Sequence, residues 1–267
     1  MRFYTGQAEI GWPAENVWQA EKRIRMEYKR ITLLAGHYGS GKTNIAVNMA
    51  LELKKQRDKV AIADLDIVNP YYRTRDSEKE LAEAGVRMIV SAYANSNLDI
   101  PAMPDAMYAV TDDPELFSII DVGGDDRGAL ALGRLAPKIL EEDYDMFLVV
   151  NRFRPLTRTA EEVEEVRQEI EFACGIPFTG IINNSNLGAE TEEETVLSSQ
   201  KYAQEVSALT GLPVVLTTVE EALYEGLKDR IENLFPLRLQ ARPTEWRMPK
   251  VQLNSPAGRL FDTGNNP

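Results

Sequence analysis

The chain has 267 residues, of which 43% are hydrophobic and 27% charged, and its formal net charge is −12. This length allows one large core, and the composition is that of an ordinary globular protein. An acidic chain matches the phosphate backbone of nucleic acids poorly, so we expect no nucleic-acid partner. One cysteine and one histidine exclude an intrachain disulfide and argue against a cysteine- or histidine-rich metal site.

The sequence shows no sign of export or membrane insertion. No run approaches the ~20 apolar residues of a membrane-spanning helix, and the N-terminus lacks a secretory signal. We therefore expect a cytoplasmic protein and no membrane partner. Residues 1–30 form an N-terminal extension, in which Pro13 could open an amphipathic helix. We expect this helix to pack on the domain; the alternative is a helix for a membrane surface or a partner.

From residue 31 onward, short apolar runs alternate with amphipathic stretches. The expected strands cover residues 31–35, 60–63, 86–90, 117–120, 146–150, 178–182 and 213–216. The expected helices cover residues 43–55, 160–173, 195–209 and 220–234. Strands separated by helices predict an α/β fold, with a doubly wound, mostly parallel sheet and helices on both faces. This domain would span residues 31–235, and residues 236–267, rich in proline, would form a C-terminal tail.

The segment between the first strand and the first helix matches a phosphate-binding loop. Gly36, four variable residues and Gly41-Lys42-Thr43 complete the Walker A pattern of P-loop nucleoside-triphosphatases. Glycines let backbone amides converge on phosphate oxygens, and the following helix directs its positive end at the same anion. We expect Lys42 to bridge the terminal phosphates during catalysis and Thr43 to bind Mg²⁺. The predicted nucleotide contacts here are Gly36, His37, Tyr38, Gly39, Ser40, Gly41, Lys42, Thr43 and Asn44.

Carboxylates follow two further strands. Asp64 and Asp66 come after the second strand, and Asp121 ends the strand that begins at residue 117. In a parallel sheet, the carboxyl ends of the strands share one edge, so all three can face the bound phosphates. We predict that Asp121 and Asp64 order the magnesium and that Asp66 orients the attacking water, although Asp64 and Asp66 could exchange roles. The amide of Gly123 would approach the γ-phosphate. The alternative is that these aspartates cap helices or fill turns.

A polar and aromatic loop covers residues 67–77. Beside the γ-phosphate it could rearrange on hydrolysis, as a switch loop does. Arg73 and Arg75 could supply positive charge to the phosphates, within one subunit or across a dimer. Equally, both could be solvated loop cations.

The order of these motifs resembles the MinD/ParA group of P-loop ATPases, within the CobQ/CobB/MinD/ParA nucleotide-binding domain. The stretches that carry the resemblance are residues 36–43, 64–66 and 121–124, within residues 31–235. The resemblance implies a homodimer with ATP sandwiched between subunits. Family members usually carry a lysine where this chain has His37, and a neutral imidazole cannot do the same electrostatic work. Either His37 substitutes in part, the dimer differs, or an arginine takes over; the candidates are Arg73, Arg75 and Arg127.

The asparagine-rich segment 183–186 follows a strand where related folds place the base-reading loop. We predict that Asn183 and Asn184 contact the base. A guanine reader usually has aspartate at the position of Asn186, where an amide fits guanine poorly and adenine better. This favours ATP over GTP. The alternative is a simple asparagine-rich turn.

Three functions remain open at this point. The leading hypothesis is an Mg²⁺-dependent ATPase switch that acts through a dimer or an unknown protein partner. The second is a small-molecule kinase that uses the same loop, for which Arg152, Arg154 and Arg158 are the nearest candidate lid. The third is a module that holds nucleotide without hydrolysing it.

Overall fold

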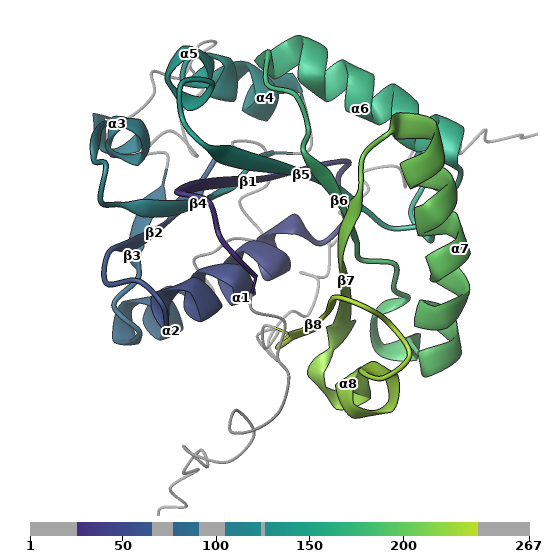
Figure 1. Ribbon diagram of the computed structural model, residues 1–267. Helices are drawn as coiled ribbons and strands as arrows, with labels where there is room; N and C mark the ends of the chain where they lie inside the picture. Colours follow the sequence, from purple (N-terminus) through teal and green to yellow (C-terminus); the bar gives the residue numbers. More distant parts are fainter. Residues whose placement is uncertain (1–25, 66–76, 91–104, 124–125, 240–267) are drawn as a thin grey trace, which may run out of the picture.

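The computed structural model describes residues 26–65, 77–90, 105–123 and 126–239 (Figure 1). The helix predicted to open at Pro13 falls almost wholly outside the described residues, and residues 26–30, which are described, are not helical. Asp66, Arg73 and Arg75 also lie outside the described residues. None of the described helices is long and apolar enough to cross a membrane.

A single sheet of eight parallel strands organises the described chain, in the order β3-β2-β4-β1-β5-β6-β7-β8. The strands are β1 (Ile31–Ala35), β2 (Val60–Asp64), β3 (Arg87–Val90), β4 (Phe117–Asp121), β5 (Tyr144–Val150), β6 (Gly180–Asn183), β7 (Val214–Glu220) and β8 (Leu234–Leu237). The predicted doubly wound, parallel α/β fold is therefore confirmed.

Helices cover both faces of this sheet (Figure 1). They are α1 (Lys42–Lys54), α2 (Glu78–Glu83), α3 (Asp105–Asp112), α4 (Asp126–Gly133), α5 (Ala136–Ile139), α6 (Ala160–Cys174), α7 (Glu193–Thr210) and α8 (Glu221–Leu227). The core on one face includes side chains of α3, α4, α5, α6 and α7, and the core on the other includes those of α1 and α2. On α1 the predicted inner face is confirmed, since Ile45, Met49 and Leu53 are all buried.

The two ends of α6 show how the sequence sets helix boundaries. The side chain of Thr159 accepts a hydrogen bond from the amide of Glu162, which satisfies one free donor at the start of the helix. Gly175, with φ of 72°, ends the helix in the left-handed conformation that glycine adopts without strain. Between them, Val163 and Val166 are buried on the inner face.

The helix predicted over residues 220–234 was wrong in its second half. Helix α8 ends at Leu227, and the chain then reverses through Asn233, which has φ of 54°. Strand β8 follows and pairs with β7, so the sheet continues across the predicted domain boundary at residue 235. Helices α2, α3, α4 and α5 were not predicted; they are four to eight residues long and carry short apolar patterns.

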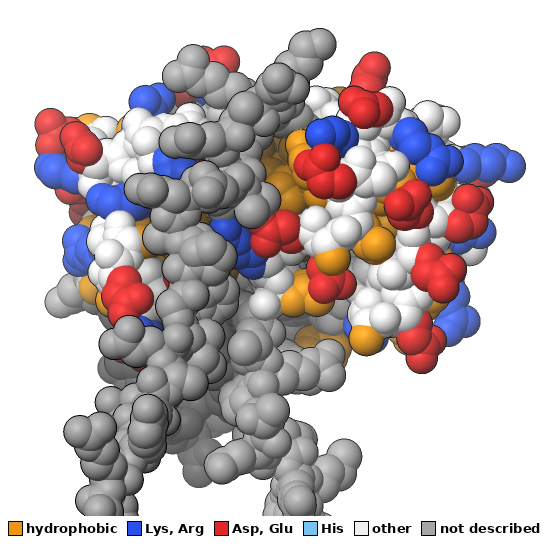
Figure 2. All heavy atoms as spheres, turned by 90° about the horizontal axis from the view of Figure 1, so that it is seen from below, with side chains coloured by type: hydrophobic (Ala, Val, Ile, Leu, Met, Phe, Trp, Pro, Cys, Tyr) orange, Lys and Arg blue, Asp and Glu red, His pale blue; other side chains and the backbone are white. Residues whose placement is uncertain are grey.

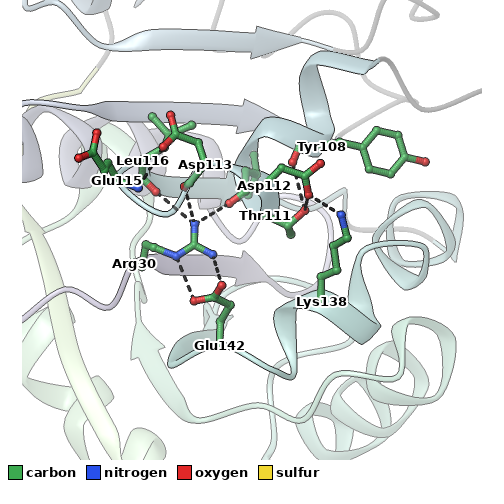
Figure 3. A network of polar contacts seen from close by, with 10 residues as sticks. Arg30, Tyr108, Thr111, Asp112, Asp113, Glu115, Leu116, Lys138 and Glu142 are labelled. Carbon is green, nitrogen blue, oxygen red and sulfur yellow. Dashed lines mark hydrogen bonds and ion pairs between the residues drawn. The ribbon is translucent and has the colours of Figure 1, made fainter.

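At the amino-terminal end of the strands, Arg30 ties several connections together (Figure 3). Its Nη1 donates to the carbonyls of Val110 and Asp113, each at 3.0 Å, and its Nη2 lies 2.7 Å from Glu142 Oε1. These bonds join the entry to β1 with the α3–β4 and α5–β5 connections. The largely buried guanidinium therefore has a structural role.

Candidate nucleotide-binding site

The Walker A segment lies where the winding of the sheet changes direction. Strand β1 is flanked by β4 on one side and β5 on the other, although neither is the next strand in the sequence. The loops after β1, β4 and β5 therefore meet at the carboxyl edge of the sheet. In open α/β sheets this point is where ligands bind.

Two glycines of the Walker A segment have conformations and neighbours that exclude side chains. Gly36 has φ of 146°, and a Cβ atom there would lie 2.5 Å from the carbonyl oxygen of Val149. Gly41 has φ of 95°, and a Cβ atom there would lie 2.2 Å from Nδ2 of Asn184. The main chain of β5 and the side chain of Asn184, just after β6, thus lie directly against the loop, which explains the need for glycine at these two positions.

Helix α1 begins directly after Gly41, and its first turn is prepared for an anion. No side chain caps this end of the helix, and the first turn contains no acidic residue. The backbone amides there and the helix dipole therefore favour a negative ligand. Lys42, in the same turn, is buried and donates to the carbonyls of Gly36 and His37 at 2.9 and 3.3 Å. Its ammonium group lies folded over the loop that would hold the phosphates.

The predicted magnesium ligands come together. Thr43 Oγ1 donates to Asp121 Oδ2 over 2.6 Å, across 78 residues of sequence. Asp64 is in register with Asp121 on the neighbouring strand, and both carboxylates are almost fully buried. Hydroxyl and carboxylate oxygens suit Mg²⁺, which usually takes one or two carboxylates and completes its shell with water and phosphate. These donors therefore fit the ion, although no cluster of three or more His, Cys, Asp or Glu side chains occurs among the described residues.

Asn183 and Asn184 are engaged in supporting the loops. Asn184 donates to the carbonyl of Ser40 in the Walker A segment at 2.6 Å and accepts from Thr218 Oγ1 at 2.6 Å. Asn183 is fully buried and donates to Ser199 Oγ at 2.9 Å. Asn184 thus acts as a brace between β7 and the phosphate loop. Base contacts by these two residues stay a prediction.

The remaining predicted residues have simpler surroundings. Tyr38 is 57% exposed, and Nδ1 of His37 lies 3.1 Å from the Tyr38 carbonyl oxygen. Gly123 is buried against the start of α4, where a Cβ atom on Gly128 would lie 2.8 Å from the Cα of Gly123. Asn44 lies in the first turn of α1, and its carbonyl accepts from Asn48 Nδ2 at 2.8 Å. The side chain of Arg127 lies outside the described atoms.

Sequence reasoning missed Asn151, which follows β5 and is fully buried. Its Oδ1 accepts from the amides of Phe153 and Asn186 at 3.0 and 3.3 Å, and its Nδ2 donates to the Asn186 carbonyl. Asn151 therefore fastens the loop after β5 to the loop after β6. The available signal was a polar residue directly after a buried apolar run, which marks a strand end at the ligand edge.

One sequence family matches most of the domain. It is described as the CobQ/CobB/MinD/ParA nucleotide binding domain, and it matches residues 31–197, which is more than half of the chain. No curated protein matches the sequence significantly.

Two solved structures are similar to this chain. FtsY from Mycoplasma mycoides is 18% identical over 74% of this chain and 64% of its own, with a TM-score of 0.50. The signal recognition particle 54 kDa protein from Aeropyrum pernix K1, in complex with GDP, is 20% identical over 72% of this chain and 41% of its own, with a TM-score of 0.47. The alignments span less than two thirds of these proteins. Because the family model matches more than half of the chain, the chain belongs to the CobQ/CobB/MinD/ParA nucleotide-binding-domain family.

Proposed function

We propose that this protein is a Mg²⁺-dependent ATPase and a switch of the MinD/ParA type, which binds and hydrolyses ATP to control a homodimer or a partner protein. The observation that supports this best is the hydrogen bond between Thr43 and Asp121. It joins the ends of two separate motifs directly beside Lys42, at the start of α1. A hydroxyl, a carboxylate and an ammonium group in this arrangement suit a metal-bound polyphosphate.

Each of these side chains has a defined task in the proposed reaction. Lys42 would exchange the carbonyls of Gly36 and His37 for phosphate oxygens, so that it keeps its hydrogen bonds while it stabilises negative charge. Thr43 and Asp121 would hold the magnesium, which offsets charge on the phosphate oxygens when it is bound. Asp66, outside the described residues, is proposed to orient the attacking water.

We assign ATP rather than GTP from the chemistry of the loop after β6. Asn186 occupies the position at which a guanine reader carries aspartate, and an amide cannot accept both hydrogen bonds of the guanine edge. Asn186 also donates to the Asn184 carbonyl at 2.8 Å and accepts from the amide of Gly188 at 3.1 Å. Its amide is therefore engaged within its own loop, which disfavours guanine further.

We propose a cytoplasmic protein partner or a second copy of the chain as the receiver of the signal, and no nucleic acid. Figure 2 shows acidic and basic side chains interspersed over the face that it presents. On α8 and just after it, Lys228 pairs with Glu225, and Arg230 lies 3.5 Å from Glu193. Such paired charges do not form the basic surface that nucleic acids require.

Phosphate release by the purified full chain, with no second substrate, tests the proposal. We expect turnover with MgATP to exceed turnover with MgGTP and to disappear in EDTA. Asp121→Asn should lower turnover ~100-fold, because it weakens the metal site. Asp143→Asn is the matched control, since Asp143 is 77% exposed at the opposite end of the sheet.

Three results would contradict this assignment in different ways. Phosphate transfer that depends strictly on an acceptor molecule would identify a kinase. Tight binding of ATP without turnover, also in the presence of cell extract, would identify a non-hydrolysing module. A preference for GTP would overturn the base assignment alone.

A further inference from the structure

Arg154 lies against the phosphate loop, although it belongs to the connection after β5. A Cβ atom built on Gly39 would lie 3.8 Å from Nε, 3.9 Å from Cδ and 4.0 Å from Cζ of Arg154. The planar guanidinium therefore runs alongside the middle of the Walker A segment. This proximity follows from the strand order, because β5 is the direct neighbour of β1.

The connection that carries Arg154 is a fixed turn. The amide of Arg154 donates to the carbonyl of Asn151 at 3.0 Å, and Thr157 Oγ1 donates to the same carbonyl at 2.8 Å. From α7, the hydroxyl of Tyr202 donates to the Thr157 carbonyl at 2.6 Å. Burial raises the pKa of Tyr202, so this hydroxyl stays a donor over the physiological pH range.

The same turn contains a strained residue. Leu156 has φ of 63°, a left-handed conformation that leucine rarely adopts, and its side chain is exposed. Conformations of this kind are energetically unfavourable and tend to cluster at functional sites. The Leu156 side chain is exposed, so its packing does not explain why the turn adopts this conformation. The turn does, however, place Arg154, two residues earlier, beside the phosphate loop.

The guanidinium of Arg154 is also available for a ligand. Within the described part of the chain, the arginines that form ion pairs are Arg30, Arg167, Arg230 and Arg238. Arg154 is exposed to solvent and is not among them. A magnesium-bound triphosphate carries more negative charge than one lysine neutralises. A second cationic side chain beside the loop could therefore bind phosphate oxygens.

We propose that Arg154 is a nucleotide-binding residue, which contacts the polyphosphate from beside Gly39 and raises the affinity for nucleoside triphosphate. This inference rests on the proposed function, because it requires a polyphosphate in the loop. Arginine suits the task, since its fork of donors can bind two phosphate oxygens while the plane packs on the backbone. The residue acts within its own subunit.

A calorimetric titration of the protein with MgATP tests this role. Arg154→Gln should weaken binding about tenfold, as expected for loss of a charge-assisted hydrogen bond. Arg154→Lys should recover part of the loss, because the charge remains. The matched control is Arg134→Gln: Arg134 is also exposed, but it lies in the connection between α4 and α5, after the end of α4. It should bind MgATP as the wild type does.

Salt provides a readout that a merely structural role would not change. Raising ionic strength should weaken MgATP binding less in Arg154→Gln than in the wild type, because one screened attraction is gone. Equal affinity and equal salt dependence in Arg154→Gln, with a wild type that binds MgATP, would overturn the role of Arg154 alone. A wild type that binds no nucleotide would overturn the proposed function and this inference with it.

Discussion

Two basic side chains lie at opposite ends of β1, Arg30 partly buried and Lys42 buried, and they are held in different ways. Arg30, just before the strand, bonds to residues between 80 and 112 positions away, including a carboxylate (Figure 3). Lys42, after the strand, donates to carbonyls only five and six positions away, within its own loop. The first cation joins distant segments of the fold, whereas these two hydrogen bonds of the second lie within the phosphate loop.

This difference separates stability from function. Bonds between distant segments resist unfolding, because they are lost when the chain loses its tertiary structure. Bonds within one loop can be exchanged for bonds to a ligand without disturbing the rest of the sheet. Substitutions at the two ends of β1 should therefore have opposite profiles: a loss of stability at one end and a loss of binding at the other.

The largest effect is expected for Lys42→Ala. It should weaken MgATP binding at least ~100-fold, because charge on the terminal phosphates is left uncompensated in a partly buried loop. The melting temperature should change by only a few degrees, since the two hydrogen bonds to the carbonyls of Gly36 and His37 are local. Calorimetry and thermal unfolding measure the two quantities. An MgATP affinity within threefold of that of the wild type would contradict the assignment of this loop as the nucleotide-binding site.

Asp66→Ala should separate binding from chemistry. We expect MgATP affinity within a few-fold of the wild type and turnover lowered ~100-fold, as for loss of a positioned base. Single-turnover phosphate release measures the chemical step. Unchanged release would exclude Asp66 and transfer the role to Asp64. A loss of binding instead would assign Asp66 to the metal.

Arg30→Ala should have the reverse profile. We expect a loss of about 2 kcal/mol in the free energy of unfolding, below the range for fully buried pairs because Glu142 is 36% exposed. The neighbouring Lys29→Ala is the control, because its ion pair with Asp143 is exposed and should contribute little to stability. Urea unfolding measures both. MgATP affinity of the folded protein should be unchanged. A weakened affinity would show that Arg30 also affects nucleotide binding at the other end of β1.

The smallest effect is expected for Asn184→Ala, which removes the brace between Ser40 and Thr218. If Asn184 only supports the loop, affinities for MgATP and MgGTP should fall by the same factor, about tenfold. If it reads the base, the two affinities should change unequally. Parallel titrations with both nucleotides decide between these roles and so test the ATP assignment as well.

Local sequence determined the parts of the site that are contiguous. The Walker A segment, its strand and its helix follow from glycine spacing, a buried apolar run and helical periodicity, all within residues 31–54. The expectation that Asp121 meets Thr43 also came from sequence, because parallel strands place their ends at one edge. In contrast, β8 was not predicted, because a strand of four residues is too short to show a recognisable alternation of apolar and polar residues.

Tertiary structure alone decided which other loops reach the phosphate loop. Strand order makes β5 the neighbour of β1 and so brings Arg154 to Gly39. The parallel crossovers likewise bring Asn184 to Ser40 across 144 residues, a contact that the sequence did not predict. Composition and periodicity report on near neighbours along the chain. Contacts between strand ends depend on how the whole sheet is ordered, and that order is set by the packing of both helical layers at once.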